Sequence, residues 1–186
     1  MKNLFLLLFT AISMIACSNN DEGEPNNDDN TPSAGTAQIT LTAGGEQYKI
    51  NGPCGWASVM GTNYVGANDA DNNLKTFSAF FNLEALPAVT TTYTLVKSPE
   101  WDEEDNDPTH IWMNVTEIRN GGLFQYASDD SSGTLTLVVD GNKVTVDLTG
   151  IVLQPYDGSS LIYENLNVGA FSNPGTLSGE LIFYRN

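Results

Sequence analysis

The sequence predicts an antiparallel all-β domain, either a β-sandwich or a flattened β-barrel built of hairpins. The clearest indication is the stretch 132–150, SGTLTLVVDGNKVTVDLTG, in which Thr alternates with Leu or Val on both sides of Asp140-Gly141. This alternation is typical of a half-buried β-hairpin. Similar runs recur about every ten residues, and no long amphipathic helix separates them, as is typical of sandwiches and barrels.

The turn of this central hairpin can form in two ways. Asp140-Gly141 can make a two-residue loop, or the turn can span 140–143. Both registers keep the same side chains inward, because they differ by an even number of residues. The inward set is Leu135, Leu137, Val139, Val144, Val146 and Leu148, whereas Val138 points the other way. The inward set needs a second apolar face to cover it.

The other strands are expected in chain order as follows. In the first hairpin the turn Gly44-Gly45 places Leu41 opposite Tyr48 and Ile39 opposite Ile50. After a turn at 52–55, further strands are expected at 56–65 (two short strands around Gly61), 74–81, 93–97, 109–118, 123–127, 151–156, 161–163 and 176–185. Asn120-Gly121 should join 109–118 to 123–127 as a hairpin. A helical turn is suggested at 83–88, and Pro87 limits it.

The N-terminus has the features of a targeting segment. Lys2 precedes an apolar run from Leu4 to Ile15, which is shorter than the roughly 20 residues of a membrane-spanning helix. The run ends in Met14-Ile15-Ala16-Cys17, which resembles the lipobox of bacterial lipoproteins. That resemblance implies that residues 1–16 are a signal peptide and that Cys17 receives the lipid and becomes the mature N-terminus. The alternative is an ordinary signal peptide followed by a chance cysteine.

Residues 17–35 are expected to form a disordered acidic tether. After Cys17 they contain no large apolar side chain, so they cannot offset their ordering entropy by burial. Ser18 resembles the residue that follows the cysteine in lipoproteins released to the outer membrane. The acidic residues Asp21, Glu22 and Glu24 resemble an export signal that sends some Gram-negative lipoproteins to the cell surface, although a solvated linker explains them equally well. We therefore expect a lipid anchor in the outer membrane.

The remaining residues, 36–186, have the length of one domain. They carry six Lys or Arg against eighteen Asp or Glu. This acidic surface argues against nucleic acid and against direct docking on anionic lipid, so the membrane is expected to be contacted only through the lipid. With Cys17 lipidated, Cys54 has no disulfide partner, and a monomer stabilised by its core is expected.

Three short segments of this domain carry a second resemblance. They are Ser-Gly-Thr-Leu-Thr at 132–136, Gly-Ala-Phe at 169–171 and Ser-Gly-Glu at 178–180. Together with the lipobox and the acidic tether, the domain resembles a family of small Gram-negative outer-membrane lipoproteins of uncharacterised function. The resemblance implies an all-β domain and implies no activity.

The acidic stretch 100–107 is a candidate metal site. Asp102, Glu104, Asp105 and Asp107 alternate or adjoin in a manner that could bind Ca²⁺, which takes about six to eight oxygen ligands. The stretch lacks the Gly and the closing Glu of an EF-hand loop, and so does a second acidic stretch at 69–73. The alternative is a solvated charged loop.

The strand 109–118 carries a candidate glycan site. His110, Trp112 and Asn114 alternate with Ile111, Met113 and Val115, so one of the two triplets should face outward. If the apolar triplet faces the core, Trp112 lies on the surface beside His110, near the acidic loop and Trp101. Aromatic rings flanked by Asp and Asn are typical of sugar sites, because the ring stacks on a pyranose while the polar groups bind its hydroxyls. The alternative is that Trp112 is buried under a loop or in a second sheet.

Catalytic motifs are absent from the sequence: it has no Gly-x-Ser-x-Gly, phosphate loop, dinucleotide fingerprint or metalloprotease helix. A nucleophilic pair of Cys54 and His110 would require the two to meet in space, and the alternative is a small buried cysteine. The sequence therefore favours a binding or interaction module, with a glycan as the candidate ligand. The alternatives are a structural or assembly partner of an envelope protein complex and, as a minority interpretation, a hydrolase.

Overall fold

The computed structural model describes residues 35–59, 62–83, 85–98, 107–119, 122–156, 167–168 and 173–185, which form twelve strands. The strands are β1 Gly35–Ala43, β2 Glu46–Val59, β3 Thr62–Asn68, β4 Lys75–Phe81, β5 Thr91–Leu95, β6 His110–Arg119, β7 Gly122–Ala127, β8 Thr134–Asp140, β9 Lys143–Asp147, β10 Val152–Pro155, β11 Asn167–Val168 and β12 Gly175–Tyr184. None of these residues forms a helix that is long and apolar enough to cross a membrane.

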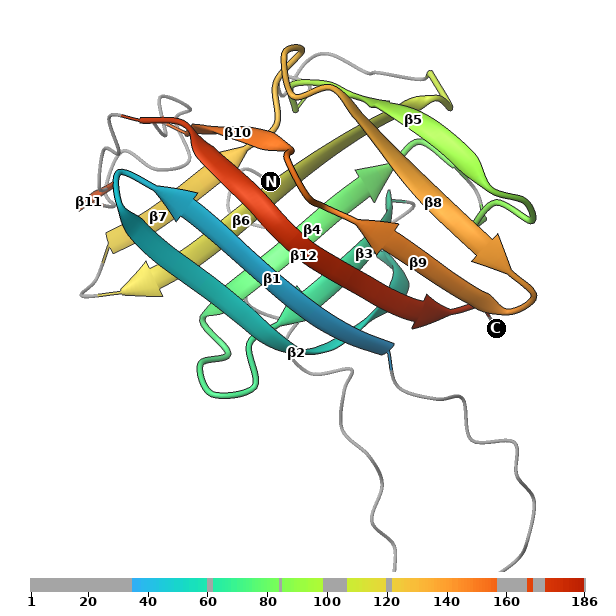
Figure 1. Cartoon of the computed structure of the whole chain (residues 1–186), viewed down its shortest axis with the longest axis horizontal. Coiled ribbons are helices and arrows are strands. Elements are labelled where there is room, and N and C mark those ends of the chain that lie inside the picture. Colours follow the sequence, from blue (N-terminus) through green and yellow to red (C-terminus); the bar gives the residue numbers. More distant parts are fainter. Residues whose placement is uncertain are drawn as a thin grey trace, which may run out of the picture.

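Nine of the strands close into a barrel (Figure 1). Their order is β1-β2-β3-β4-β6-β5-β8-β9-β12, and β12 pairs back onto β1. Of the two architectures that the sequence allowed, the barrel is confirmed and the sandwich is not supported. The expectation of a purely antiparallel sheet is wrong at two places, because β5 pairs parallel with β6 and β11 pairs parallel with β7.

The interior of the barrel is filled by apolar side chains from every strand of the closed ring. The largest of those that are fully buried are Phe77, Phe183, Ile39, Leu41, Ile50, Leu95, Ile111, Met113, Leu135, Leu137 and Leu148. They alternate along their strands with outward residues, because successive side chains in a strand point to opposite faces. The barrel is therefore a packed core with a single layer of sheet around it.

Both of the best-defined hairpins form as the sequence predicted. Leu41 lies opposite Tyr48 and Ile39 opposite Ile50 across the turn at Gly44-Gly45. In the central hairpin β8 and β9 close at the pair Asp140–Lys143, so of the two expected turns the one that spans 140–143 is observed, with Gly141 and Asn142 as its loop. Its inward set is buried, apart from Val139, which is partly buried, and Val138 is 49% exposed.

The expected turn at 52–55 is wrong, because β2 runs without a break from Glu46 to Val59. Asn51 donates its backbone N–H to Asp69 on the side away from β1, and Pro53, two residues on, presents its nitrogen on that same side. Pairing with β3 begins only at Cys54. The missing N–H of Pro53 therefore removes no ladder bond, which explains why a proline is tolerated inside this strand.

The helical turn expected at 83–88 does not occur in the described residues there, 83 and 85–88. Pro87 limits helix formation, and its carbonyl instead accepts a hydrogen bond from Arg185 Nη1 at 2.9 Å. The loop is thus tied to the end of β12. The strand expected at 161–163 lies outside the described residues.

Two buried serines hold the place where the sheet branches. One edge of β12 pairs with β10 near its start and with β9 further along. One edge of β6 likewise pairs with β5 at its start and with β7 further along. Ser128 accepts from the N–H of Met113 at 2.9 Å and donates to the carbonyl of Val96 at 2.7 Å. Ser132 donates to the carbonyl of Val152 at 2.6 Å. These side chains replace ladder bonds that the diverging strands cannot make.

Candidate functional site

The outer surface of β3, β4, β6 and β7 carries a group of residues that we call the aromatic face: Tyr64, Phe80, Trp112, Ser78, Asn114 and Gln125. Ile111, Met113 and Val115 are buried in the core, so the alternation along β6 turns Trp112 and Asn114 outward. Of the two orientations that the sequence allowed, the structure shows the one with the apolar triplet in the core. The barrel wall is one sheet thick, so no second sheet among the described residues encloses Trp112.

Three aromatic rings of this face form a row across neighbouring strands. The registers place Tyr64 opposite Phe80 and Phe80 opposite Trp112. The rings of Phe80 and Trp112 are stacked, with centroids 3.7 Å apart and planes inclined by 13°, and Tyr64 follows at 5.7 Å from Phe80. Tyr64 and Phe80 are 3% and 8% exposed, and burial raises the pKa of the Tyr64 hydroxyl. Trp112 is half-buried and forms the more open end of the row.

Polar side chains continue the aromatic face beyond the rings. Asn114 lies opposite Ser78 on β4 and opposite Ala127 on β7, and Gln125 lies opposite Thr116. Asn114 and Gln125 are only 1% and 8% exposed. Among the described residues, Asn114 Nδ2 and Gln125 Oε1 nevertheless have no hydrogen-bond partner. A buried donor and a buried acceptor are therefore left without a bond on adjacent strands, which is uncommon in folded proteins.

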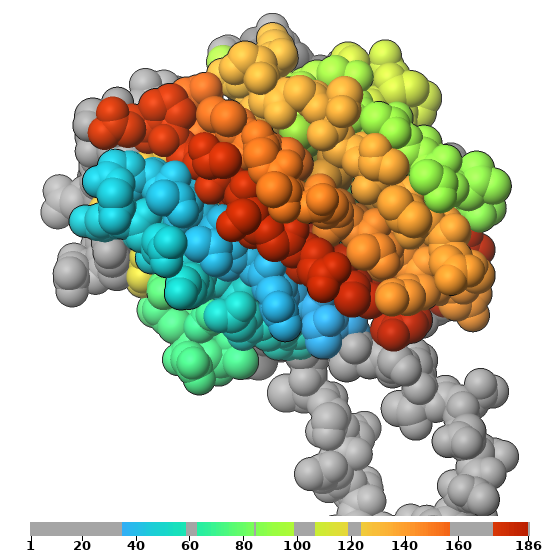
Figure 2. Space-filling model, viewed as in Figure 1, coloured from blue at the N-terminus to red at the C-terminus, as the bar shows by residue number. Residues whose placement is uncertain are grey.

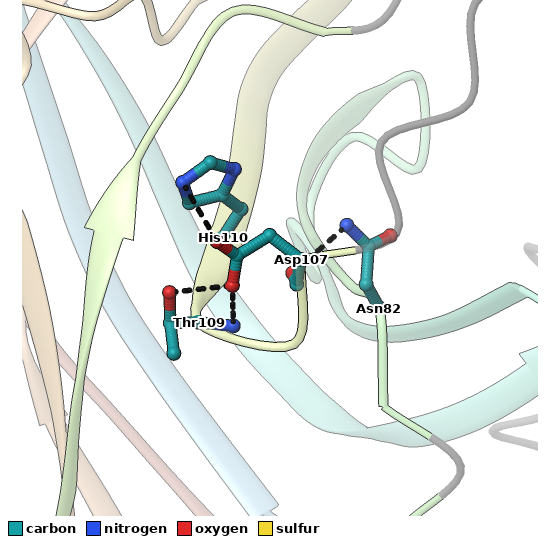
Figure 3. A network of polar contacts seen from close by, with 4 residues as sticks. All are labelled: Asn82, Asp107, Thr109 and His110. Carbon is teal, nitrogen blue, oxygen red and sulfur yellow. Dashed lines mark hydrogen bonds and ion pairs between the residues drawn. The ribbon is translucent and has the colours of Figure 1, made fainter.

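His110 begins β6, two residues before Trp112 and on the same face. Figure 3 shows its polar neighbours Asp107, Thr109 and Asn82. Its Nε2 lies 3.6 Å from Asp107 Oδ2. Asp107 also accepts from the backbone N–H of Thr109 at 2.8 Å and from its hydroxyl at 2.7 Å, and Asn82 donates to the Asp107 carbonyl. The hydrogen bonds from Thr109, followed by the charge of His110, lower the pKa of Asp107. Asp107 is thus an ionised turn residue that orients the imidazole.

The four predicted ligand-binding residues are only partly brought together. His110, Trp112 and Asn114 share the outer side of β6, whereas Trp101 lies outside the described residues. No sequence motif pointed to Phe80, Tyr64 or Gln125 as members of this face. Phe80 could have been found, because the inward alternation of Phe77, Ala79 and Phe81 leaves it as an outward phenylalanine. The pairing of β4 with β3 and β6, by contrast, is not encoded in any local pattern.

The predicted calcium ligands are not placed together by the structure. Asp102, Glu104 and Asp105 lie outside the described residues, so calcium at this loop stays a prediction, and Asp107 is engaged as described above. In the second acidic stretch, Asp69 accepts backbone N–H groups from Asn51, Asp71 and Asn72, which makes it a turn cap. Within the described residues no group of three or more His, Cys, Asp or Glu is arranged to hold a metal ion.

Cys54 and His110 do not form a pair. Cys54 packs against the core inside the barrel. Across the sheet it lies opposite Ala67, which lies opposite Phe77, which in turn lies opposite Val115 on β6. His110 lies five residues from Val115 along β6, roughly 16 Å away, and on the outer face. Burial raises the pKa of the Cys54 thiol to about 12, and the thiol donates to the carbonyl of Ile182 at 3.2 Å. The thiol is therefore neutral at physiological pH, which is the opposite of an activated nucleophile.

Two hollows of the described part of the chain lie away from the row of aromatic rings. A cavity of about 10 Å³ between β1, β2, β4, β6 and β7 has room for no more than a water molecule. An open groove of about 630 Å³ crosses the outer side of β1, β2, β9 and β12, the face toward the viewer in Figure 2, and polar side chains line it. There Asp147 lies opposite Glu180, but hydrogen bonds from Thr149 lower the pKa of Asp147. A general acid requires the opposite shift.

The chain was compared with protein families, characterised proteins and solved structures, and none of them matches it. A functional assignment therefore depends on the chemistry of the surface described above.

Proposed function

We propose that this protein is a lipid-anchored binding module of the outer membrane and that it binds a glycan on the aromatic face. One observation carries the proposal: Trp112 points out of the barrel, half-buried and stacked on Phe80 of the neighbouring strand. An aromatic ring offers a flat apolar surface on which a pyranose can stack.

The rigidity of the site favours binding over chance exposure of a tryptophan. Trp112 is stacked on Phe80 of the neighbouring strand, and Phe80 is itself flanked by Tyr64 on the next strand. Side chains held by packing lose little entropy when a ligand binds, so more of the contact energy is available for affinity. The domain, residues 36–186, has eighteen acidic and six basic residues. Its negative charge favours a neutral or cationic glycan over an acidic one.

The anchor is the second part of the proposal. Lipid on Cys17 would hold the barrel at the membrane through residues 17–35, a tether whose root-mean-square span is roughly 25 Å if it is a flexible coil. Cys17→Ala should then abolish membrane association of the processed protein, because the lipid is its only expected contact with the bilayer. Fractionation of cells that express each form measures this. Recovery of processed Cys17→Ala protein in the membrane fraction would end the lipoprotein interpretation.

Glycan binding should depend on Trp112. We expect Trp112→Ala to weaken binding to the recognised glycan by about tenfold or more, because the variant lacks the indole ring on which the sugar would stack. A glycan array followed by titration calorimetry measures the change. Val138→Ala is the matched control, since Val138 is an outward apolar residue on β8, away from the aromatic face. Equal binding by the Trp112→Ala and Val138→Ala proteins, both folded, would contradict the proposal.

A second candidate function, assembly with an envelope protein, is favoured by one edge of β2. Residues 46–52 pair with β1, but among the described residues the ladder with β3 begins only at Cys54. The N–H and C=O groups of Gln47 and Lys49 point to this edge, as those of Asn51 do. Such an edge can accept an extended segment of another protein. If no glycan binds, this candidate becomes the leading one.

A further inference from the structure

The part of the β2 edge that is open to solvent is short and has defined ends. Asn51 donates its N–H to Asp69 and accepts from the N–H of Ala70 at its carbonyl, so the loop after β3 occupies the edge there. Main-chain groups two residues apart in a strand point to the same side, so those of Gln47 and Lys49 point to this edge as well. Both residues are exposed, and among the described residues neither makes a main-chain hydrogen bond on this side. The edge therefore offers two N–H and two C=O groups.

Another extended backbone matches this arrangement of donors and acceptors. Gln47 and Lys49 present one N–H and one C=O each, and the two residues are separated by roughly 6.8 Å along the strand. Further along the same edge, β2 pairs antiparallel with β3. An added strand in the same direction as β3 would exchange two hydrogen bonds with each of these residues. It would need two bonded residues and one residue between them.

Lys49 determines which charge suits one of the two bonded residues. Its side chain is exposed and lines the β2 end of the open groove. It forms no ion pair with a carboxylate of the described residues. A residue opposite Lys49 on an added strand shares its outer face, and opposite charges in such a pair are favourable. Because the domain as a whole is acidic, a segment with many carboxylates would be repelled, so a single Asp or Glu fits best.

The residue between the two bonded positions faces the inner side of the sheet, next to Tyr48. Tyr48 and Ile50 are buried on that side, and with Val115 and Phe124 they line the small cavity. An apolar side chain can cover these residues without losing the hydration of a polar group. The edge therefore favours a segment in which an apolar residue lies between an acidic residue and an uncharged one.

We infer that the β2 edge binds an extended segment of a partner protein with an Asp or Glu opposite Lys49, an apolar residue opposite Tyr48 and an uncharged residue opposite Gln47. The inference rests on the second candidate function, assembly with an envelope protein, and it specifies the chemistry of the partner. The main chain of the segment supplies the hydrogen bonds, and its side chains supply the selectivity.

Random short peptides displayed on phage, selected on the full lipid-anchored chain in detergent, test this inference. We expect the selected peptides to contain an Asp or Glu next to an apolar residue, and titration calorimetry measures the affinity of synthetic copies. N-methylation of either bonded residue should weaken binding about tenfold or more, because it removes a donor from the ladder, whereas N-methylation of the apolar residue between them should have an effect of about twofold or less. Replacing the acid by its amide should weaken binding about two- to fivefold.

Variants of β2 assign the binding to this edge. Gln47→Pro should weaken peptide binding about tenfold or more, whereas Gln47→Ala, which keeps the N–H, should leave it unchanged. The proline variant should fold, because Pro53 already occupies the same side of β2 opposite Thr36 of β1. Lys49→Gln should abolish the preference for the acid over its amide. Trp112→Ala should leave peptide binding unchanged, because Trp112 lies on β6.

The outcomes separate the inference from the function on which it rests. Peptides that lose affinity for Gln47→Pro but show no preference for an acid, or a preference that survives in Lys49→Gln, overturn the inference and leave the second candidate function standing. If no peptide is selected, or if none loses affinity for Gln47→Pro, both are overturned. Lys49 would then be a residue that protects a short edge from pairing.

Discussion

Gly179→Ala should lower the free energy of unfolding by roughly 3–5 kcal/mol, the largest effect that we expect from a single methyl group in this protein. Gly179 has φ +106°, and a Cβ atom there would lie 1.8 Å from the carbonyl oxygen of Gln38. The obstacle is backbone of the neighbouring strand, so no side-chain rotation can relieve it. The substituted chain must either distort β12 or separate it from β1.

The position of Gly179 makes this distortion expensive. β12 pairs with β1 on one edge and with β9 and β10 on the other, so it is the strand that closes the barrel (Figure 1). The carbonyl of Gly179 also accepts a hydrogen bond from Leu148, between the β9 and β10 ladders. A shift at this residue therefore disturbs the pairing on both sides of the strand at once.

Urea unfolding of the wild type and of two glycine variants measures the effect. Gly55→Ala in β2 is the matched control, because Gly55 also lies in a strand and a Cβ atom there meets nothing within 4 Å. We expect a change of about 1 kcal/mol or less for the control. Similar losses for Gly179→Ala and Gly55→Ala would show that the β1–β12 contact is not what limits the stability of the barrel.

Leu137→Ala and Val146→Ala should each destabilise the protein by roughly 2–4 kcal/mol, because each deletes apolar volume from a packed interior and leaves a cavity. The two side chains lie opposite each other in the central hairpin, with Leu137 0% and Val146 2% exposed. The surrounding strands belong to a closed barrel, which limits how far they can collapse into the space.

Val138→Ala is the control for this pair, because it lies next to Leu137 in the same strand and is 49% exposed. We expect it to cost about 0.5 kcal/mol or less. Denaturant titrations of the three variants give the comparison. Equal losses at all three positions would mean that Val138 is buried as well, which would contradict its 49% exposure.

The sequence could predict those parts of the site that depend on neighbours along one strand. The strict alternation around Ile111 and Met113 was sufficient to place Trp112 and Asn114 on one face of β6, and the structure shows that this is the outer face. The positions of Gln125 and Phe80 next to these residues could not be predicted from alternation, because they lie on other strands. Their contacts depend on which strands are adjacent and in what register, and pairing between residues distant in the chain leaves no local signature.

By itself, the sequence determined the all-β class, the strand faces and the two tight hairpins. Each of these follows from a local pattern of period two and from turn residues such as Gly44-Gly45. Only the tertiary structure decided that the sheet closes, that β2 continues through Pro53 and that the sheet branches at Ser128 and Ser132. The reason is physical: closure depends on the summed twist and stagger of many strands and on backbone contacts such as that at Gly179. These quantities belong to the assembled sheet, and no single stretch of chain contains them.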